Sequence, residues 1–208
     1  MTSFCAERTQ IVLGTRNPGK VREIGRLLFP IGVDVVSLEA FQNVPEIIED
    51  GSSFAENAAI KAVETARHLN RWVIAEDSGL AVDALGGAPG IYSARFSGSN
   101  ATDETNNAKL ITELAHVPAS QRGAHYVCHV AVASPSCRIM WHGECQCRGR
   151  ITADPRGSNG FGYDPYFLIP EYHRTFGELS PAVKNILSHR ARTMRKLAGA
   201  LFAVLNGV

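Results

Sequence analysis

Residues 14–21 read GTRNPGKV and carry the clearest chemical signal in the chain. The pattern comes within one residue of the phosphate-binding loop G-x-x-x-x-G-K-[S/T], in which backbone N–H groups and a lysine contact phosphate oxygens. It follows the apolar residues 11–13 and precedes a helical pattern, so we expect the loop amides and Lys20 to face a phosphate at a helix N-terminus. Val21 lacks the hydroxyl that binds Mg²⁺ in such loops, so any metal must be held by other residues.

Carboxylates that could replace this metal ligand follow the apolar residues 72–75. If a strand ends there, Asp77 emerges at its carboxyl edge, where open α/β sheets bind their ligands. If the strand continues, Glu76 and Asp77 point to opposite faces and only one of them faces a cleft. A carboxylate in this place can hold Mg²⁺ or accept a proton from water, although an acid that caps a turn is an equal alternative. The acidic residues 46–51 offer a second ligand or form a solvated loop.

The stretch 159–165 reads NGFGYDP and predicts an aromatic platform. Its glycines let the backbone approach a ligand closely, and an exposed Phe161 ring could stack on a nucleobase. The alternative is an aromatic side chain that fills the core beside a glycine turn. Lys184, His189 and Arg190 lie just before or at the start of the last predicted helix. Their N–H groups suit a phosphate or a keto oxygen, while a solvated helix face is the simpler interpretation of such charges taken alone.

The composition is that of a globular protein without a broad charged surface. The 208 residues hold 21 Lys and Arg against 20 Asp and Glu, and 45% are hydrophobic. This balance argues against a nucleic-acid or membrane-surface footprint, and no apolar run approaches the roughly 20 residues that span a bilayer. Without a secretion signal, the five cysteines are expected to be reduced thiols in a cytoplasmic protein. Cys145, Cys147 and His142 lack the usual spacing of a zinc site.

The order of predicted elements indicates an α/β fold with a mixed sheet. Apolar runs at 10–14, 33–36 and 72–75 predict strands, and they are separated by helices that begin near Pro18 and Ser53. A hairpin with strands at 125–134 and 138–148 and a final helix at 189–205 complete the pattern. The glycine-rich residues 86–100 predict an irregular loop. We expect one domain over residues 1–208, with a flexible segment at 1–9.

Six segments, in order along the chain, resemble the Ham1/inosine triphosphate pyrophosphatase family. They are residues 14–20, 54–57, 76–80, 86–95, 160–165 and 188–190. The resemblance runs from about residue 10 to residue 200 and implies a Mg²⁺-dependent, cytoplasmic homodimer. Such an enzyme hydrolyses non-standard purine nucleoside triphosphates (ITP, dITP and XTP) to the monophosphate and pyrophosphate, which cleanses the nucleotide pool. The resemblance also implies a long mixed β-sheet flanked by helices, with two lobes around a central substrate cleft.

The resemblance further implies a role for each site residue. Asp77 is the proton acceptor and a metal ligand together with Glu49, although Glu46 and Asp50 remain alternatives in the same loop. The implied substrate-binding residues are Thr15, Arg16, Asn17, Pro18, Gly19, Lys20, Ser78, Phe161, Gly162, Tyr163, Asp164, Lys184, His189 and Arg190. Two departures stand out: Glu76 occupies a position where many members have Asp, and the stretch 144–150 is longer than the usual strand, which leaves its register open.

Cleavage between the α- and β-phosphates fits these residue types. Asp77 would activate water, and Lys20 and Lys184 would neutralise phosphate charge. Donors at His189 and Arg190 would meet the 6-keto oxygen of the base. Adenine carries an amino group there and would place a donor against a donor. Two alternatives from other classes remain, a P-loop kinase or GTPase and a nucleotide sensor without catalysis. A pyrophosphatase for modified pyrimidines is a third.

Overall fold

A single seven-stranded mixed sheet organises the computed structural model, which describes residues 8–206. The strand order is β2-β1-β3-β4-β5-β6-β7, and β1 pairs in parallel with both β2 and β3, while all later neighbours are antiparallel. The strands are β1 (Thr9–Leu13), β2 (Val33–Ser37), β3 (Val73–Val82), β4 (Gly123–Ala133), β5 (Ile139–Ile151), β6 (Phe167–Ile169) and β7 (Arg174–Thr175). The predicted mixed α/β sheet is thus confirmed.

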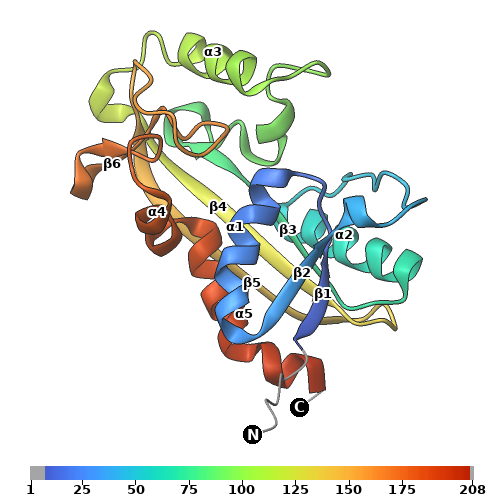
Figure 1. Cartoon of the computed structure of the whole chain (residues 1–208). Helices are drawn as coiled ribbons and strands as arrows, with labels where there is room; N and C mark the ends of the chain where they lie inside the picture. Colours follow the sequence, from blue (N-terminus) through green and yellow to red (C-terminus); the bar gives the residue numbers. More distant parts are fainter. Residues whose placement is uncertain (1–7, 207–208) are drawn as a thin grey trace, which may run out of the picture.

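Over the described residues, five α-helices accompany this sheet (Figure 1). They are α1 (Pro18–Leu28), α2 (Phe54–Leu69), α3 (Asp103–Glu113), α4 (Pro181–Leu187) and α5 (His189–Asn206). The first two begin where the sequence predicts: the Asn17 side chain caps α1, and Ser53 Oγ accepts the Glu56 N–H at the start of α2. Within residues 8–206, no helix is long and apolar enough to cross a membrane.

The two faces of the sheet are covered by different helices. Alternate residues of β1, β3 and β4 pack on one side against apolar residues of α1 and α5, such as Ile24 and Leu197. The opposite side packs against the alanine face of α2, which includes Ala58, Ala62 and Ala66. Small alanines allow this helix to lie close to the sheet, so residues at its start reach β3 directly.

Three details differ from the sequence expectations. The strand predicted at 72–75 does not end there but runs on to Val82, so Asp77 lies within β3 and not after it. Lys184 belongs to a separate short helix, α4, which the sequence analysis missed. The flexible segment expected at 1–9 falls mostly on residues 1–7, which lie outside the described residues, and Thr9 already belongs to β1.

The hairpin of β4 and β5 settles the register that the longer stretch 144–150 left open. Residues Gly143 to Arg150 pair one by one with β4, and the only shift between these two strands lies at Val132 and Ala133. The irregular loop predicted at 86–100 contains a 3-10 helix, η4 (Gly90–Arg95), which packs over β3.

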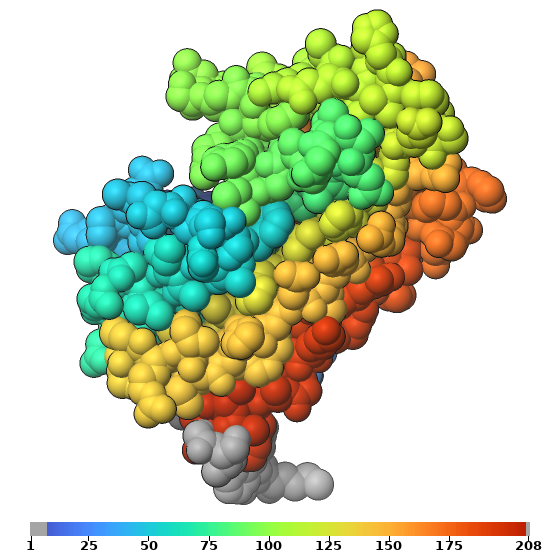
Figure 2. Space-filling view, turned by 180° about the vertical axis from the view of Figure 1, so that it is seen from behind, coloured from blue at the N-terminus to red at the C-terminus, as the bar shows by residue number. Residues whose placement is uncertain are grey.

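A second core forms at the other end of the long strands. Leu80 and Val82 of β3 pack there with Leu110 of α3 and with the aromatic residues Phe167 and Phe176. Residues 77–79 lie between this core and the two clusters around α5 and α2, and none of the three clusters includes them. Figure 2 shows the surface hollowed where the cyan residues around 50 meet the green residues around 95.

Gly79 allows η4 to cross this part of β3. A Cβ atom at residue 79 would lie 2.4 Å from the carbonyl oxygen of Gly90 and 2.4 Å from Ser93 Oγ. The same hydroxyl accepts the N–H of Leu80 and donates to the Gly90 carbonyl, so it cannot move away without losing both bonds. The close approach of η4 to the strand therefore depends on glycine.

Gly79→Ala is expected to lower the free energy of unfolding by about 2 kcal/mol, because the added methyl group forces η4 away from β3. Gly199→Ala is the matched control, since nothing lies within 4 Å of the corresponding Cβ on α5. It should raise stability by about 0.5–1 kcal/mol through helix propensity. Urea unfolding measures both, and an unchanged midpoint for Gly79→Ala would contradict the close approach.

Candidate functional site

The loop between β1 and α1 is built around the side chain of Asn17. Asn17 Oδ1 accepts the N–H groups of Gly19 (2.8 Å) and Lys20 (3.2 Å), and the Asn17 N–H donates to Thr15 Oγ1. The expectation that the loop amides face a phosphate is therefore wrong for these two, because the helix cap already uses them. What the loop presents are side chains: Thr15, Arg16, Asn17 and Lys20 all line one hollow beside β3.

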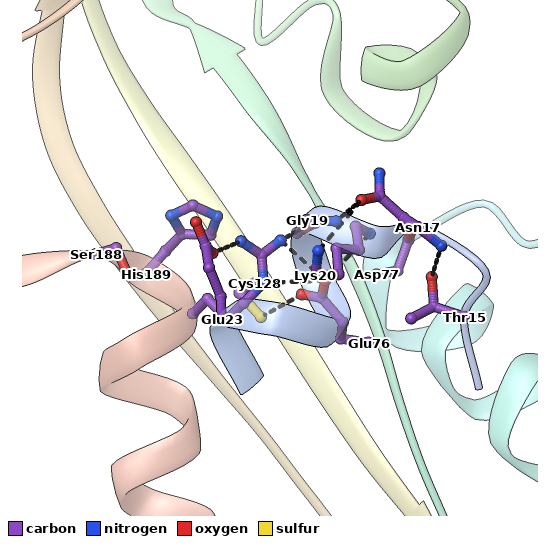
Figure 3. Close-up of polar contacts among 12 residues, drawn as sticks. Thr15, Asn17, Gly19, Lys20, Glu23, Glu76, Asp77, Cys128, Ser188 and His189 are labelled. Carbon is purple, nitrogen blue, oxygen red and sulfur yellow. Dashed lines mark hydrogen bonds and ion pairs between the residues drawn. The ribbon is translucent and has the colours of Figure 1, made fainter. Parts of the chain in front are cut away.

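Glu76 forms a buried centre on the α5 side of β3. Its carboxylate is 1% exposed and accepts from Arg190 Nε (3.1 Å) and Nη2 (2.9 Å), from Lys20 Nζ (3.1 Å) and from the Cys128 thiol (3.0 Å). Figure 3 shows Cys128 and Lys20 around this carboxylate. Burial alone would raise the pKa of Glu76, but the charges of Arg190 and Lys20 outweigh it and hold the pKa well below its ordinary value.

Glu23 of α1 extends this ion-pair network to a second lysine. Its carboxylate contacts Arg190 Nη1 at 2.5 Å and Lys184 Nζ at 2.9 Å. Burial would raise the pKa of Glu23, yet the two cations lower it below its ordinary value. The cations contributed by α1, α4 and α5 are thus fixed to each other through two carboxylates, Glu23 and Glu76, and cannot move independently.

Asp77 points to the opposite face, toward α2, as alternation along a continuous strand requires. Its Oδ1 accepts from Lys61 Nζ at 3.1 Å, and its Oδ2 accepts from Asn57 Nδ2 at 3.2 Å. Lys61 also donates to Glu49 Oε2 at 2.8 Å, so one ammonium group bridges both predicted metal ligands. Burial raises the pKa of Asp77 and the Glu49 charge adds to this rise, while Lys61 and Lys20 oppose it.

The aromatic loop is folded around the buried Asp164. This carboxylate accepts the Phe161 N–H at 3.0 Å and contacts Lys184 Nζ at 2.5 Å. Burial raises the pKa of Asp164, against the opposing charge of Lys184. The Phe161 ring lies against Gly19 of α1, where a Cβ atom would come within 2.9 Å of the ring carbons. Lys184 Nζ lies 5.0 Å from the ring centroid, within reach of a cation–π contact.

His189 occupies the floor of a second hollow beside Tyr126. The two rings stack with centroids 4.6 Å apart and an interplanar angle of 8°. His189 Nδ1 is buried and has no hydrogen-bond partner among the described residues. Burial, with the nearby charge of Arg190, lowers the pKa of His189 well below its ordinary value, so the imidazole is neutral at pH 7.

The structure brings almost all predicted residues into two adjoining hollows. One is lined by Asn17, Lys20, Ser78, Phe161, Gly162, Tyr163, Asp164, Lys184, His189 and Arg190, and the other by Thr15, Arg16, Asn17, Lys20, Glu49, Asp77 and Ser78. Asn17, Lys20 and Ser78 line both hollows and join them. Pro18 lines neither and lies exposed at the first turn of α1, while Gly19 is buried under Phe161.

Four residues of the site escaped the sequence analysis: Asn57, Lys61, Glu23 and Tyr126. The first two were within reach, because their spacing of four places them on one face of the predicted helix over 53–69. Glu23 follows Lys20 by three residues on the helix that begins near Pro18, which predicts a shared face but not the partners of Glu23. Nothing in the sequence marks Tyr126, whose place depends on the pairing of β4 with its neighbours.

The donor set around Asp77 fits a hard divalent cation only together with a substrate. Among residues 8–206, no group of three or more His, Cys, Asp or Glu side chains could hold a metal ion. Asp77 and Glu49 supply two carboxylates, and Lys61 already shows that a positive charge is held between them. Mg²⁺ commonly binds through one or two carboxylates and completes its shell with waters and substrate phosphates. Of the alternatives, Glu46 lines the same hollow without an ion pair to Lys61, and Asp50 does not line it.

Glu76→Gln is expected to lower the free energy of unfolding by about 3–5 kcal/mol at pH 7, because it leaves Arg190 and Lys20 without their buried counter-charge. The folded pKa of Glu76 lies below its ordinary value of 4.5, so the stabilisation is complete above that pH and is lost as the pH falls through the folded pKa. The difference in stability between wild type and variant should therefore narrow as the pH falls below 4.5. Urea unfolding at pH 7 and pH 3, with the exposed Glu113→Gln as a control, measures this. Equal midpoints at pH 7 would contradict the role of the ion pair.

Comparison with known proteins places the chain in a family. The sequence pattern of the Ham1 family matches residues 11–200. The dITP/XTP pyrophosphatase of Rhodopirellula baltica is 50% identical over 185 residues, which cover 89% of each chain. That of Geobacillus kaustophilus is 50% identical over 188 residues, 90% of this chain and 92% of the relative.

Solved structures agree with these relatives. A HAM1 protein from Coxiella burnetii superimposes with a TM-score of 0.82 at 38% identity, over 93% of this chain and 98% of that chain. The nucleoside-triphosphatase, or dITP/XTP pyrophosphatase, of Mycobacterium abscessus gives a TM-score of 0.73 at 41% identity, over 91% and 98% of the two chains. With a family match along nearly its whole length and a shared fold, this chain belongs to the Ham1 family.

Proposed function

We propose that this chain is a dITP/XTP pyrophosphatase that hydrolyses non-standard purine nucleoside triphosphates to the monophosphate and pyrophosphate. The observation that carries the proposal is the arrangement on β3: a carboxylate held by Lys61 and Asn57 on one face, beside a cluster of fixed cations on the other. The named activity of the relatives supports it. We also propose that the chain acts as one cytoplasmic domain and assembles as a homodimer, as the family resemblance implies.

In this proposal the two adjoining hollows form one central substrate cleft between two lobes. The base lies in the hollow lined by Phe161, Tyr126 and His189, whose aromatic rings offer stacking surfaces. The triphosphate extends past Ser78 into the hollow beside β3, where Thr15, Arg16 and Lys61 line the wall. Lys20 lines both hollows and lies where the chain of phosphates passes, so its ammonium group would neutralise the leaving pyrophosphate.

Asp77 is the proposed proton acceptor for the attacking water. Burial raises its pKa, which makes the carboxylate a better base. Asn57 holds Oδ2 and Lys61 holds Oδ1, so the carboxylate has a fixed orientation before substrate arrives. Asp77 and Glu49 would hold Mg²⁺ when the substrate is bound. There the ion would neutralise phosphate charge and make water more acidic.

Base selection is assigned to the neutral His189 and to Arg190. The guanidinium of Arg190 is committed to Glu76, Glu23 and Ser78, whereas Nδ1 of His189 lacks a partner among residues 8–206. His189 lines the hollow assigned to the base, and an N–H of its neutral ring would donate to the 6-keto oxygen of hypoxanthine or xanthine. Adenine presents an amino group at that position and would leave a buried donor facing a donor, which costs binding.

A substrate panel with Mg²⁺ tests the activity. ITP, dITP and XTP should release pyrophosphate, and ATP should be turned over with a kcat/KM lower by about 100-fold, because a mismatched buried donor is worth a few kcal/mol. GTP and dUTP complete the panel, and removal of divalent cations with EDTA should stop turnover. Orthophosphate as the product would instead support a P-loop type of NTPase, and preferential turnover of dUTP would favour a pyrimidine enzyme.

Asp77→Asn tests the mechanism. The amide cannot accept the proton from water, so kcat should fall by about 1,000-fold or more while the Kd for ITP stays within about threefold. Asp154→Asn, an exposed acid outside both hollows, removes the same charge as a control. Pyrophosphate release and calorimetric ITP binding are the measurements. Undiminished release by Asp77→Asn would overturn the mechanism, and wild-type binding without turnover would identify a nucleotide sensor.

A further inference from the structure

Two side chains near the start of α3 form hydrogen bonds with the loop that carries Phe161. Asp103 Oδ2 accepts the N–H of Gly162 at 2.6 Å. Asn107, four residues later on the same face of the helix, donates from Nδ2 to the carbonyl oxygen of Gly162 at 2.9 Å. Both backbone polar groups of one residue are therefore held by side chains of one helix that is distant in sequence.

Asn107 is itself fixed in this role. It is buried, and its Nδ2 also donates to the carbonyl oxygen of Asp103 at 2.8 Å, which ties it to the start of the helix. Its Oδ1 has no hydrogen-bond partner among the described residues, so its bonds run through Nδ2 alone. The two hydrogen bonds of Nδ2 therefore fix the orientation of the Asn107 side chain, and one of them is the bond to Gly162.

These hydrogen bonds matter because the backbone of the loop has its greatest conformational freedom at Gly162. Gly162 has φ +62°, in a region that glycine enters freely, and no atom lies within 4 Å of the place where a Cβ would be. On one side of it, Asp164 accepts the Phe161 N–H and fixes the loop to Lys184. On the other side, Tyr163 donates through its hydroxyl to the Ser93 carbonyl. Neither of these two contacts restrains the peptide planes of Gly162 itself. The plane shared with Phe161 has one bond within the loop, from the Asp164 N–H to the Phe161 carbonyl oxygen at 3.3 Å, and Asp103 adds a second bond on its N–H side.

The direction of these peptide planes sets where the Phe161 ring lies. The carbonyl group of Phe161 and the N–H of Gly162 belong to the same peptide unit, so holding that N–H restrains the backbone on which the ring is carried. The ring lines the hollow assigned to the base, with Gly19 against one part of it and Arg190 5.7 Å from its centroid. A rotation of this unit would move the ring within the hollow.

We propose that Asp103 and Asn107 are positioning residues that hold the Gly162 peptide groups and thereby keep the Phe161 ring in place to stack on the base of the nucleotide. The inference rests on the proposed function, because it assigns the Phe161 hollow to the base. It makes the start of α3 part of the recognition of the base, although neither side chain has to touch the reacting phosphates.

Asp103→Ala is expected to raise the KM for dITP by about tenfold and to leave kcat within about threefold, because stacking contributes equally to ground state and transition state. The Ki of inorganic tripolyphosphate, a competitive inhibitor without a base, should stay unchanged. Asp103→Asn keeps an oxygen that can accept the Gly162 N–H and should restore most of the affinity. Asn107→Asp, nearly identical in shape but without the donor, should raise KM in the same way.

Glu104→Ala is the matched control. It removes a neighbouring carboxylate from the same turn of α3, so it reproduces any effect on the helix dipole without touching Gly162. Steady-state kinetics, tripolyphosphate inhibition and thermal unfolding are measured for all four variants. An unchanged KM in Asp103→Ala, or an equal rise in Glu104→Ala, overturns the proposal. So does a parallel loss of kcat, of tripolyphosphate affinity and of melting temperature, since that result describes general damage.

The outcome is separable from the proposed function. If wild type releases no pyrophosphate, the pyrophosphatase proposal fails. The role of Asp103 is then tested by calorimetry, which compares the affinities for ITP and for tripolyphosphate. A selective loss of ITP affinity in Asp103→Ala would still support the positioning role. Equal affinities of wild type and variant for ITP would contradict it.

Discussion

The buried ion pair between Arg190 and Glu76 is the interaction on which the arrangement of the site depends. A charge removed from water is tolerated only with a partner, so the guanidinium at the start of α5 and the carboxylate in the middle of β3 must meet wherever else the chain goes. Lys20 joins the same carboxylate and thereby fixes the start of α1, while Glu23 connects that helix to Lys184. Three helices are positioned against the sheet by these charges as well as by apolar packing.

Adjacent positions on β3 divide the work of the site between two faces. Because side chains alternate along a strand, Glu76 organises cations on the side of α5, and Asp77 meets Lys61 and Asn57 on the side of α2. Ser78, the next residue along the strand, lines both hollows, so the two faces meet at the same place. One strand thus separates the group that would activate water from the groups that hold the helices in place, although the two carboxylates are neighbours in the chain.

Much of this arrangement could be predicted from the sequence, because local signals carry it. Hydrophobic patterning indicated the mixed sheet, and Pro18 and the capping pattern at Ser53 indicated two helix starts. The near-match to a phosphate loop indicated a segment that lines the hollow beside β3. The predicted end of β3 was wrong, because two adjacent charged residues, Glu76 and Asp77, are typical of a strand end. Here both carboxylates pair with cations from other elements, and the strand continues. The amides of Gly19 and Lys20 were also misassigned, because a capping side chain competes with a ligand for the same N–H groups. Tyr126 and Glu23 depend on contacts between distant segments, which no local pattern records.

Gly19 has a different meaning from the one that its sequence motif suggests. In a phosphate loop a glycine there lets the backbone approach an anion, but here the space that a side chain would need is taken by the Phe161 ring. The glycine is a packing requirement between two segments from opposite ends of the chain, and any larger residue would act as a wedge between them. Part of the likeness of residues 14–20 to a phosphate loop therefore reflects packing against the Phe161 ring and not phosphate binding. Two families can converge on the same letters when one needs room for a phosphate and the other needs room for a ring.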